Sequence, residues 1–249
     1  MLTLQDAPAA DCAVSGRFVL RYADAAGAER ETTLEDGAGV AFEHGRPVRE
    51  FPSYRGQRNW PGLWWSATSG THVGYESWLE RDHAMALDFD SDVVALASQP
   101  FWLGFDDEEG RRRWHAPDFF ARRRDGTAVV VDCRPHGRIR PRDSAAFAAT
   151  AGACAAVGWD YRRVGELDPV WVANLRWLAG YRHARFADPE VAERLLAVFV
   201  LPRPLLAGVE LVGSRMAVLP VVFHLLWHRR LRTELTAPLS EASAVWVAR

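Results

Sequence analysis

Residues 117–134 read PDFFARRRDGTAVVVDCR, which is two strand-like runs joined by a polar turn. We expect the first strand to extend from Trp114 to Arg122. The second run, Ala128–Cys133, is unbroken and rich in β-branched residues, which is typical of a strand buried on both faces. The segment RRRDG between the runs suits a hairpin turn. The sequence therefore predicts a β-hairpin with one acid near the start of its first strand and another at the end of its second.

Helical and strand-like segments alternate on both sides of this hairpin. Upstream, apolar residues recur at helical spacing from Tyr75 to Phe89, and a short strand is expected from Phe101 to Phe105. Downstream, an alanine-rich helix (Ser144–Val157) and a short strand (Trp159–Val164) precede a helix over 168–183 that begins with a capping aspartate. This order predicts an α/β fold in which helices flank a mixed sheet.

The two ends of the chain differ in character from this core. Residues 1–46 contain short strand-like pieces, FVLRY and VAFEH, and residues 52–74 have too many breakers for a helix. Beyond His183, three helical segments and two strand-like pieces predict a small, mainly helical, winged-helix-like domain. These segments are Asp188–Phe199, Leu205–Val212, Ser214–Arg230, Leu231–Leu235 and Ala244–Ala248. We therefore expect regions at 1–46, 47–185 and 186–249, with the last boundary near residues 184–187.

The composition is that of a soluble globular protein, with 49% hydrophobic and 25% charged residues and a formal net charge of −2. The longest apolar run, Met216–Trp227, is too short to cross a membrane, and the acidic amino terminus is unlike a secretory signal. We therefore expect no membrane association and a cytoplasmic location. Cys12, Cys133 and Cys154 show no CxxC spacing, so neither a disulfide framework nor a structural zinc site is indicated.

The hairpin carries an acid at the start of one strand and an acid–x–base triplet at the end of the next. Asp118 follows a proline, and Asp132 comes 14 positions later with Arg134 two residues on. Because side chains two apart on a strand share a face, Asp132 and Arg134 point into the same space and Cys133 into the opposite one. Hydrolysis of a phosphodiester needs an activated water and neutralisation of growing charge, and carboxylate-bound divalent metals supply both. The spacing matches the PD-(D/E)xK nuclease motif, although these segments taken alone fit a capping aspartate and a solvated strand end better.

The segment upstream of the hairpin resembles a known family. Residues 75–103 read YESWLERDHAMALDFDSDVVALASQPFWL, with an acid on the expected helix and Gln-Pro leading into a strand. Together with HAPDFF and VVDCRP, this segment resembles the catalytic domain of TnsA, the endonuclease subunit of a heteromeric transposase. The resemblance covers the residues from Pro47 to His183 and includes the stretch DPVWVANLRWLAGYR. It implies a restriction-endonuclease-like fold and cleavage of DNA at a transposon end.

The resemblance also implies a set of site residues. Glu80 takes the place of the family's helix glutamate, Asp118 the metal-bridging place and Asp132 that of the second strand ligand. These three carboxylates would hold Mg²⁺ or Mn²⁺. Glu76, one helical turn before Glu80, would support the ligands or be the true ligand, unless it is a solvent-facing charge. Gln99 is a further residue that would support the ligands.

Arg134 departs from the family pattern, which has lysine at this place. Lysine can orient or activate the attacking water, whereas arginine supplies charge and a rigid fork but does not readily lose a proton. The chain contains no lysine anywhere. Arg134 is therefore compatible with nucleotide bias in a catalytic site that tolerates a plain positive charge, and equally with a decayed nuclease.

Basic residues concentrate around the hairpin, with ten arginines and three aspartates between residues 111 and 142. We expect the last three arginines, which directly follow the site, to bind DNA phosphates. They are Arg138, Arg140 and Arg142. Two earlier clusters, at 111–113 and 122–124, fit a phosphate track and solubilising charge about equally well.

Histidines and tryptophans give weaker signals. His136 could approach a scissile phosphate, whereas the other histidines of this region form no metal-ligand pattern and are expected to be structural or at the surface. Those histidines are His72, His83 and His115. The tryptophans of NWPGLWWS could stack on DNA bases, but packing over the nuclease domain is the more usual role. They are Trp60, Trp64 and Trp65.

Three functional hypotheses follow from these observations. The first is a metal-dependent DNA endonuclease that cuts double-stranded transposon ends with a DDE transposase subunit and an ATPase regulator, as the resemblance implies. The second is a non-catalytic, DNA-bound adaptor of a transposition complex, and the third is a stand-alone nuclease of the restriction or repair type. The C-terminal domain would bind DNA or, as in the family, other transposition proteins. The apolar stretch Met216–Trp227 favours core packing or protein contact over insertion into a DNA groove.

Overall fold

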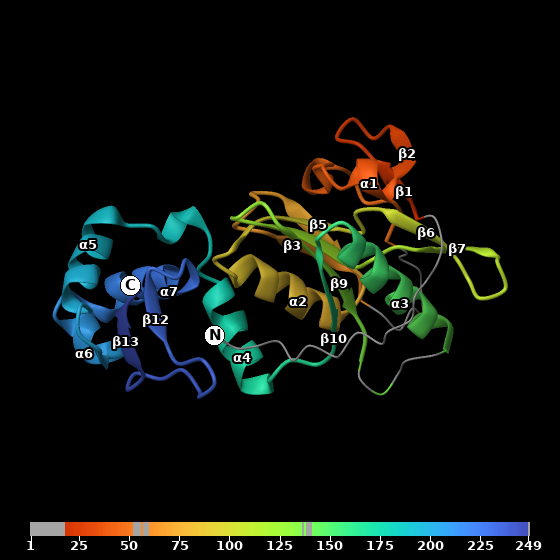
Figure 1. Ribbon diagram of the computed structural model, residues 1–249. Helices are drawn as coiled ribbons and strands as arrows, with labels where there is room; N and C mark the ends of the chain where they lie inside the picture. Colours follow the sequence, from red (N-terminus) through yellow and green to blue (C-terminus); the bar gives the residue numbers. More distant parts are fainter. Residues whose placement is uncertain (1–17, 52–55, 57–59, 136, 138–140, 249) are drawn as a thin grey trace. The chain divides into compact units, whose positions relative to one another are not determined.

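The predicted hairpin forms the middle of a four-stranded sheet in the computed structural model, which describes residues 18–51, 56, 60–135, 137 and 141–248, apart from the side chains of residues 141 and 142. The strand order is β10-β9-β8-β5 (Figure 1). β8 pairs antiparallel with both β9 and β5, and β10 runs parallel to β9. The bounds are Val93–Ser98 for β5, Phe119–Arg123 for β8, Ala128–Cys133 for β9 and Asp160–Val164 for β10. A mixed sheet in an α/β fold is therefore confirmed.

Strand β9 is buried along its whole length, as its unbroken apolar run predicts. Its residues alternate between two cores, because successive side chains of a strand point to opposite faces. Val131 packs with Ala84 of helix α2 on one face, and Val130 packs with Ala153 of helix α3 on the other. The two helices extend over Trp78–Phe89 and Pro141–Ala156. The sheet is thus covered on both faces.

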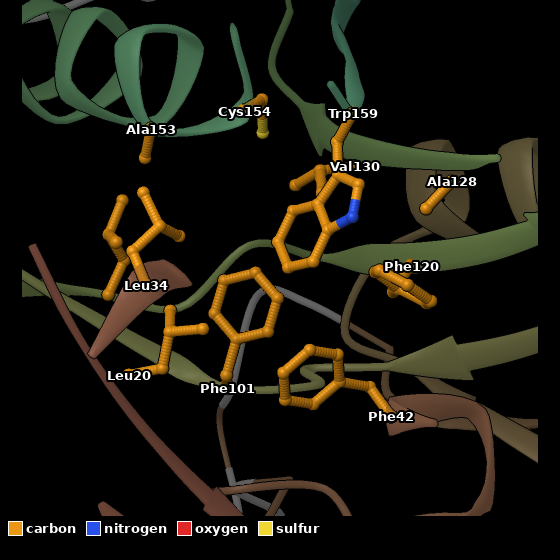
Figure 2. Packing of buried hydrophobic residues seen from close by; sticks show 11 residues of the cluster. Leu20, Leu34, Phe42, Phe101, Phe120, Ala128, Val130, Ala153, Cys154 and Trp159 are labelled. Atoms are coloured by element: carbon orange, nitrogen blue, oxygen red, sulfur yellow. The ribbon is translucent and has the colours of Figure 1, made fainter. Parts of the chain in front are cut away.

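The described part of residues 1–46 is continuous with this core. β1 pairs with β6 in a second sheet of order β2-β1-β6-β7. Leu20 of β1 and Phe42 pack with Phe101, Phe120 and Trp159 in the cluster of Figure 2. The elements concerned are β1 Val19–Ala23, β2 Glu29–Thr33, α1 Leu34–Gly37, η1 Phe42–His44, β6 Trp102–Asp106 and β7 Arg112–His115. The piece VAFEH, expected as a strand, contains the 3-10 helix η1 because Phe42 turns inward to fill this cluster.

The single strand predicted from Trp114 to Arg122 is instead two strands in different sheets. β7 ends at His115 and β8 begins at Phe119. Pro117 lies between them, has no N–H group to donate and cannot continue a ladder. The break places Asp118 at the passage from one sheet to the other. Strand β5 was not predicted, because its short apolar run follows α2 closely and periodicity alone cannot separate such a run from a helix.

Helix α2 begins later than the predicted residue 75. Ser77 is its N-cap, and the Ser77 Oγ accepts a hydrogen bond from the Glu80 backbone N–H at 3.2 Å. The Glu80 carboxylate in turn accepts hydrogen bonds from the Glu76 N–H at 2.6 Å and the Ser77 hydroxyl at 2.8 Å. This is a capping box, in which two residues satisfy the free N–H groups of a helix start. Glu76 therefore precedes the helix, and the prediction that it lies one helical turn before Glu80 is wrong.

Residues 62–75, expected to be a loop, contain a hairpin of β3 (Gly62–Trp65) and β4 (His72–Tyr75). The buried carboxylate of Asp88, near the end of α2, binds the turn of this hairpin. One carboxylate oxygen accepts hydrogen bonds from the Ser66 hydroxyl and the Thr68 N–H, at 2.7 and 2.8 Å. The other accepts from the Trp64 indole and the residue-67 N–H, at 2.9 and 3.0 Å. One side chain thus fastens the hairpin to the helix.

Asp88→Ala should lower the free energy of unfolding by about 3 kcal/mol or more, because it strands several buried donors that each cost about 1–3 kcal/mol when unsatisfied. Chemical denaturation of the variant measures this loss. Asp90→Ala is the matched control, because the Asp90 side chain is exposed and, among the described residues, accepts a hydrogen bond only from the Asp92 backbone N–H. Equal small losses in both variants would show that Asp88 does not hold the hairpin.

The residues from Leu167 onward form a second compact unit, whereas the first unit ends at Glu166. This boundary differs from the expected one near 184–187, because α4 (Pro169–Ala179) belongs to the second unit. The buried Asn174 of α4 donates to the backbone oxygens of Leu235 and Ala237, both at 2.8 Å, and accepts from the Leu239 N–H at 2.9 Å. It therefore holds the segment between β12 and β13 against α4.

The second unit has a three-stranded sheet of order β11-β13-β12. Its remaining elements are η2 Ala184–Phe186, α5 Pro189–Val198, β11 Arg203–Pro204, α6 Leu205–Glu210, α7 Arg215–Trp227, β12 Leu231–Thr233 and β13 Ala244–Val247. The apolar side chains of α7 from Val218 onward are mostly buried, as expected for core packing. Across the described part of the chain, no helix has the length and apolar character needed to span a membrane.

A fragment of residues 167–249 should unfold cooperatively, whereas a fragment of residues 186–249 should not. The shorter fragment lacks Asn174 and the buried Leu175 and Leu178 of α4, so the segment beside β13 loses its anchor. Circular dichroism during thermal unfolding distinguishes the two fragments. Cooperative unfolding of both with similar midpoints would place the boundary back near residue 185.

Candidate active site

The carboxylate of Asp118 lies where β8 begins and β9 ends. Its Oδ2 accepts a hydrogen bond of 2.6 Å from the backbone N–H of Cys133, and its own carbonyl accepts one of 2.9 Å from the Gln99 N–H. The antiparallel register pairs Phe119 with Val131, which brings the start of β8 beside the end of β9. The pairing of the two strands therefore positions Asp118 next to the second acidic segment, as the hairpin prediction required.

Asp118 and Glu80 are close enough for their charges to repel. Burial raises the pKa of Asp118 well above its usual range, and the negative charges of Glu80 and Asp132 raise it further. The Cys133 N–H and the positive charge of Arg134 oppose this rise. Four residues predicted from the sequence thus lie within one electrostatic environment.

Burial also raises the pKa of Glu80, and the neighbouring charge of Glu76 contributes to the rise. The hydrogen bonds of the capping box and the charge of Arg49 act in the opposite direction. Glu80 therefore has both a structural and an electrostatic role. It closes the start of α2, and it presents a half-buried carboxylate to Asp118.

Asp132 points to the face of the sheet that α3 covers, the same face as Val130. One of its carboxylate oxygens lies 2.9 Å from His115 Nε2, and the other accepts a 2.9 Å hydrogen bond from the Tyr161 hydroxyl. Burial raises the pKa of Tyr161, so its hydroxyl stays protonated and donates. Asp132 is thus turned toward β7 and β10, whereas Glu80 comes from α2 on the opposite face.

His115 and Tyr161 are site residues that the sequence did not reveal. His115 was expected to be structural or at the surface, whereas the structure places it against Asp132 and edge-on to the Phe147 ring, with 5.8 Å between ring centroids. It stands in the segment HAPDFF, three residues before Asp118. Tyr161 comes from β10, far along the chain, and no local pattern signals its contact.

Arg134 directly follows β9, and its backbone N–H donates to the Val164 carbonyl at 2.8 Å. Its guanidinium carbon lies 5.8 Å from the centroid of the Phe147 ring. The Nε atom of this side chain is buried and has no hydrogen-bond partner among the described residues. The positive charge therefore stays available at the end of the strand, beside Asp118.

Gln99 and Glu76 form a supporting contact on the other side of the site. Gln99 is buried and has a φ of 44°, a backbone conformation that residues other than glycine rarely adopt. Its side-chain amide donates to Glu76 at 3.2 Å, and Arg49 donates to the second oxygen of Glu76 at 3.0 Å. Glu76 is thus paired with Arg49 and half-buried, which argues against a solvent-facing charge.

Several of the predicted contact residues lie outside the described residues or have other partners. Arg138, Arg140 and His136 lie outside the described residues, as does the side chain of Arg142. The arginines of 111–113 and 122–124 bond acids or carbonyls of the chain, which fits the solubilising alternative. Of the tryptophans, Trp64 bonds Asp88 and Trp60 is exposed. His83 is buried against the Gly165 carbonyl and His72 is exposed, as expected for structural and surface residues.

The chemistry of the donor set suits a hard divalent cation in part. Glu80 and Asp118 are half-buried carboxylates whose repulsion a cation would relieve. Within the described ranges, however, no three His, Cys, Asp or Glu side chains are arranged to hold a metal ion. The reason is visible in the contacts, because Asp132 faces His115 and Tyr161. Burial also raises the pKa of the Cys133 thiol, and the charges of Asp118 and Glu80 raise it further.

Comparison with models of protein families finds no match to this chain, and no curated protein matches it either.

Asp118→Asn should stabilise the metal-free protein at neutral pH and above. The pKa of Asp118 is higher in the folded chain than in the unfolded chain. The contribution of Asp118 to the free energy of unfolding is therefore complete below a pH of about 4, where the carboxyl is protonated in both states. This contribution is lost as the pH rises through the raised pKa of the folded chain. Asparagine does not ionise, so the variant keeps its stability as the pH rises. The difference in the free energy of unfolding between variant and wild type should therefore disappear in acid. Chemical denaturation across pH measures the difference, and a difference independent of pH would contradict this electrostatic account.

Proposed function

We propose that the chain is a metal-dependent DNA endonuclease subunit of a heteromeric transposase. The observation that carries this proposal is the closeness of the half-buried Glu80 and Asp118 carboxylates, beside the positive charge of Arg134. Buried like charges are unfavourable unless a function or a counter-ion uses them, and such groups concentrate at catalytic sites. The resemblance of residues 75–103 and 117–134 to TnsA gives these groups the roles of metal ligands and phosphate-binding cation.

Glu80 and Asp118 are the residues that would hold Mg²⁺ or Mn²⁺. The bound cation would supply positive charge to the phosphate and lower the pKa of a bound water. The Cys133 N–H fixes the orientation of Asp118, and the capping box fixes that of Glu80. Arg134 would contact a phosphate oxygen through its fork of N–H donors but would not remove a proton from water.

The second unit supports a role in a complex with DNA or protein. Its order of elements is helix, strand, helix, helix, strand, strand, from α5 to β13, with β13 central in the sheet. This order supports the proposal of a winged-helix-like domain. Because α7 is largely buried in the core of its unit, we infer that contacts with transposition proteins are the more suitable use. A DDE transposase subunit and an ATPase regulator are the partners that the resemblance implies.

A non-catalytic adaptor is the second candidate, and a specific observation favours it. Asp132 is held by His115 and Tyr161, and arginine stands in the place of the family's lysine. A chain with this arrangement could bind DNA and partners without cutting. The adaptor hypothesis and the nuclease hypothesis therefore differ in what cleavage assays should find.

Glu80→Gln should abolish metal-dependent cleavage but keep the stability of the protein. Glutamine can still accept the hydrogen bond from the Glu76 N–H through its one side-chain oxygen and can donate to the Ser77 hydroxyl through its amide, whereas it removes the charge that a cation needs. Glu80→Ala should lose cleavage and also about 1 kcal/mol of stability, because the cap is lost. The assay is nicking of duplexes that carry the ends of the native element, with Mg²⁺ or Mn²⁺, with and without the neighbouring transposase.

Asp118→Ala and Arg134→Lys complete this test. Cleavage by the wild type that is lost in Asp118→Ala supports the nuclease, and cleavage unchanged in Asp118→Ala refutes the assigned site. DNA binding without cleavage by the wild type, with cutting only in Arg134→Lys, supports the adaptor. Cleavage that needs no transposase would favour the stand-alone nuclease.

A further inference from the structure

Arg134 and Arg163 place two guanidinium groups on one aromatic ring. Their guanidinium carbons lie 5.8 and 6.0 Å from the centroid of Phe147, a buried residue of α3. Arg163 belongs to β10 and stands directly beside Asp132 in the parallel ladder with β9. Neighbouring residues of a ladder share a face, and residues two apart on a strand do too. Arg163, Asp132 and Arg134 therefore gather on the face that α3 covers.

Neither guanidinium forms an ion pair with a residue in the described part of the chain. The nearest acid, Asp132, has its two oxygens in contact with His115 and Tyr161. Arg162, the preceding residue of β10, differs in this respect because it lies 3.7 Å from a carboxylate oxygen of Asp160. Arg163 is thus a half-buried cation that lies beside Asp132 in the ladder and over the ring that Arg134 also approaches.

Two guanidinium groups that approach one ring repel each other, and an anion that contacts both lowers this repulsion. Arginine suits a phosphate group because its planar fork donates two parallel hydrogen bonds. The ring of Phe147 holds both side chains at the end of β9, close to Asp118, where Arg134 already lowers the cost of a buried carboxylate. The arrangement is suited to a negatively charged group that carries several oxygens.

We propose that Arg163 is a second phosphate-contacting residue, which binds a backbone phosphodiester of DNA alongside Arg134. This inference rests on the proposed function, since it names DNA as the substrate of the same site. It adds a residue from β10 to the set predicted from the sequence. The alternative is that Arg163 only balances the charge of Asp132.

Binding of a fluorescent duplex by the full chain, measured by anisotropy over a range of salt without catalytic metal, tests the proposal. Arg163→Ala should weaken binding and lower the slope of log affinity against log salt by about 0.9, the value for one lost phosphate contact. Arg163→Lys should recover part of the affinity, because it keeps the charge without the fork. Arg162→Ala is the matched control and should bind like the wild type, since Arg162 lies on the other face and has an acid partner.

Thermal unfolding of each variant shows whether the fold is retained, and Arg163→Lys decides if Arg163→Ala is unstable. A salt slope in Arg163→Ala equal to that of the wild type, or equal losses of affinity in the variants at 162 and 163, would overturn the proposal.

Cleavage measured in parallel distinguishes failure of this proposal from failure of the proposed function. A slope that depends on Arg163 without any cleavage keeps the phosphate site and refutes the nuclease, whereas cleavage with an unchanged slope does the reverse. A wild type that binds no DNA overturns both.

Discussion

The hydrogen bond from the Cys133 N–H to the Asp118 carboxylate joins the end of the sheet to the candidate site. It requires the antiparallel pairing of β8 with β9, because only that register brings the start of one strand beside the end of the other. Pro117 contributes because it interrupts the extended strand between β7 and β8. The carboxylate is thereby left at a strand end instead of within a ladder. The position of Asp118 is thus a consequence of backbone pairing.

The half-buried Glu80 lies close enough to Asp118 for two like charges to repel. A structure holds such a pair only when other interactions fix both groups. Here the capping box fixes Glu80, and backbone hydrogen bonds fix Asp118. The start of α2 and the end of the sheet are therefore stabilised by the same residues that could bind a cation. Structural and chemical roles coincide at these two positions.

The two faces of the sheet separate the acidic residues of the site. Glu80 approaches from the α2 face, whereas Asp132 lies on the α3 face with His115 and Tyr161. The alternation of side chains along β9 causes this separation, since Asp132 follows Val130 by two residues. The nuclease and adaptor hypotheses differ in whether Asp132 can leave these partners. Arg134 and Arg163, which approach the Phe147 ring, lie on the same face of the sheet as Asp132. A movement of Asp132 away from His115 and Tyr161 would therefore also affect these two arginines.

The sequence by itself determined the central elements of the fold. The apolar run of β9, the aspartate cap of α4 and the alternation of helices with strands were predicted, and Glu80, Asp118 and Arg134 were found from spacing and resemblance. The start of α2, the break at Pro117 and the strand β5 were not, because local patterns are ambiguous over a few residues. Only the tertiary structure brought His115, Tyr161 and Arg163 to the site, joined β1 to the core and assigned α4 to the second unit. Those contacts depend on which strands pair and which faces are covered, and a linear pattern of residues does not encode such pairings between distant segments.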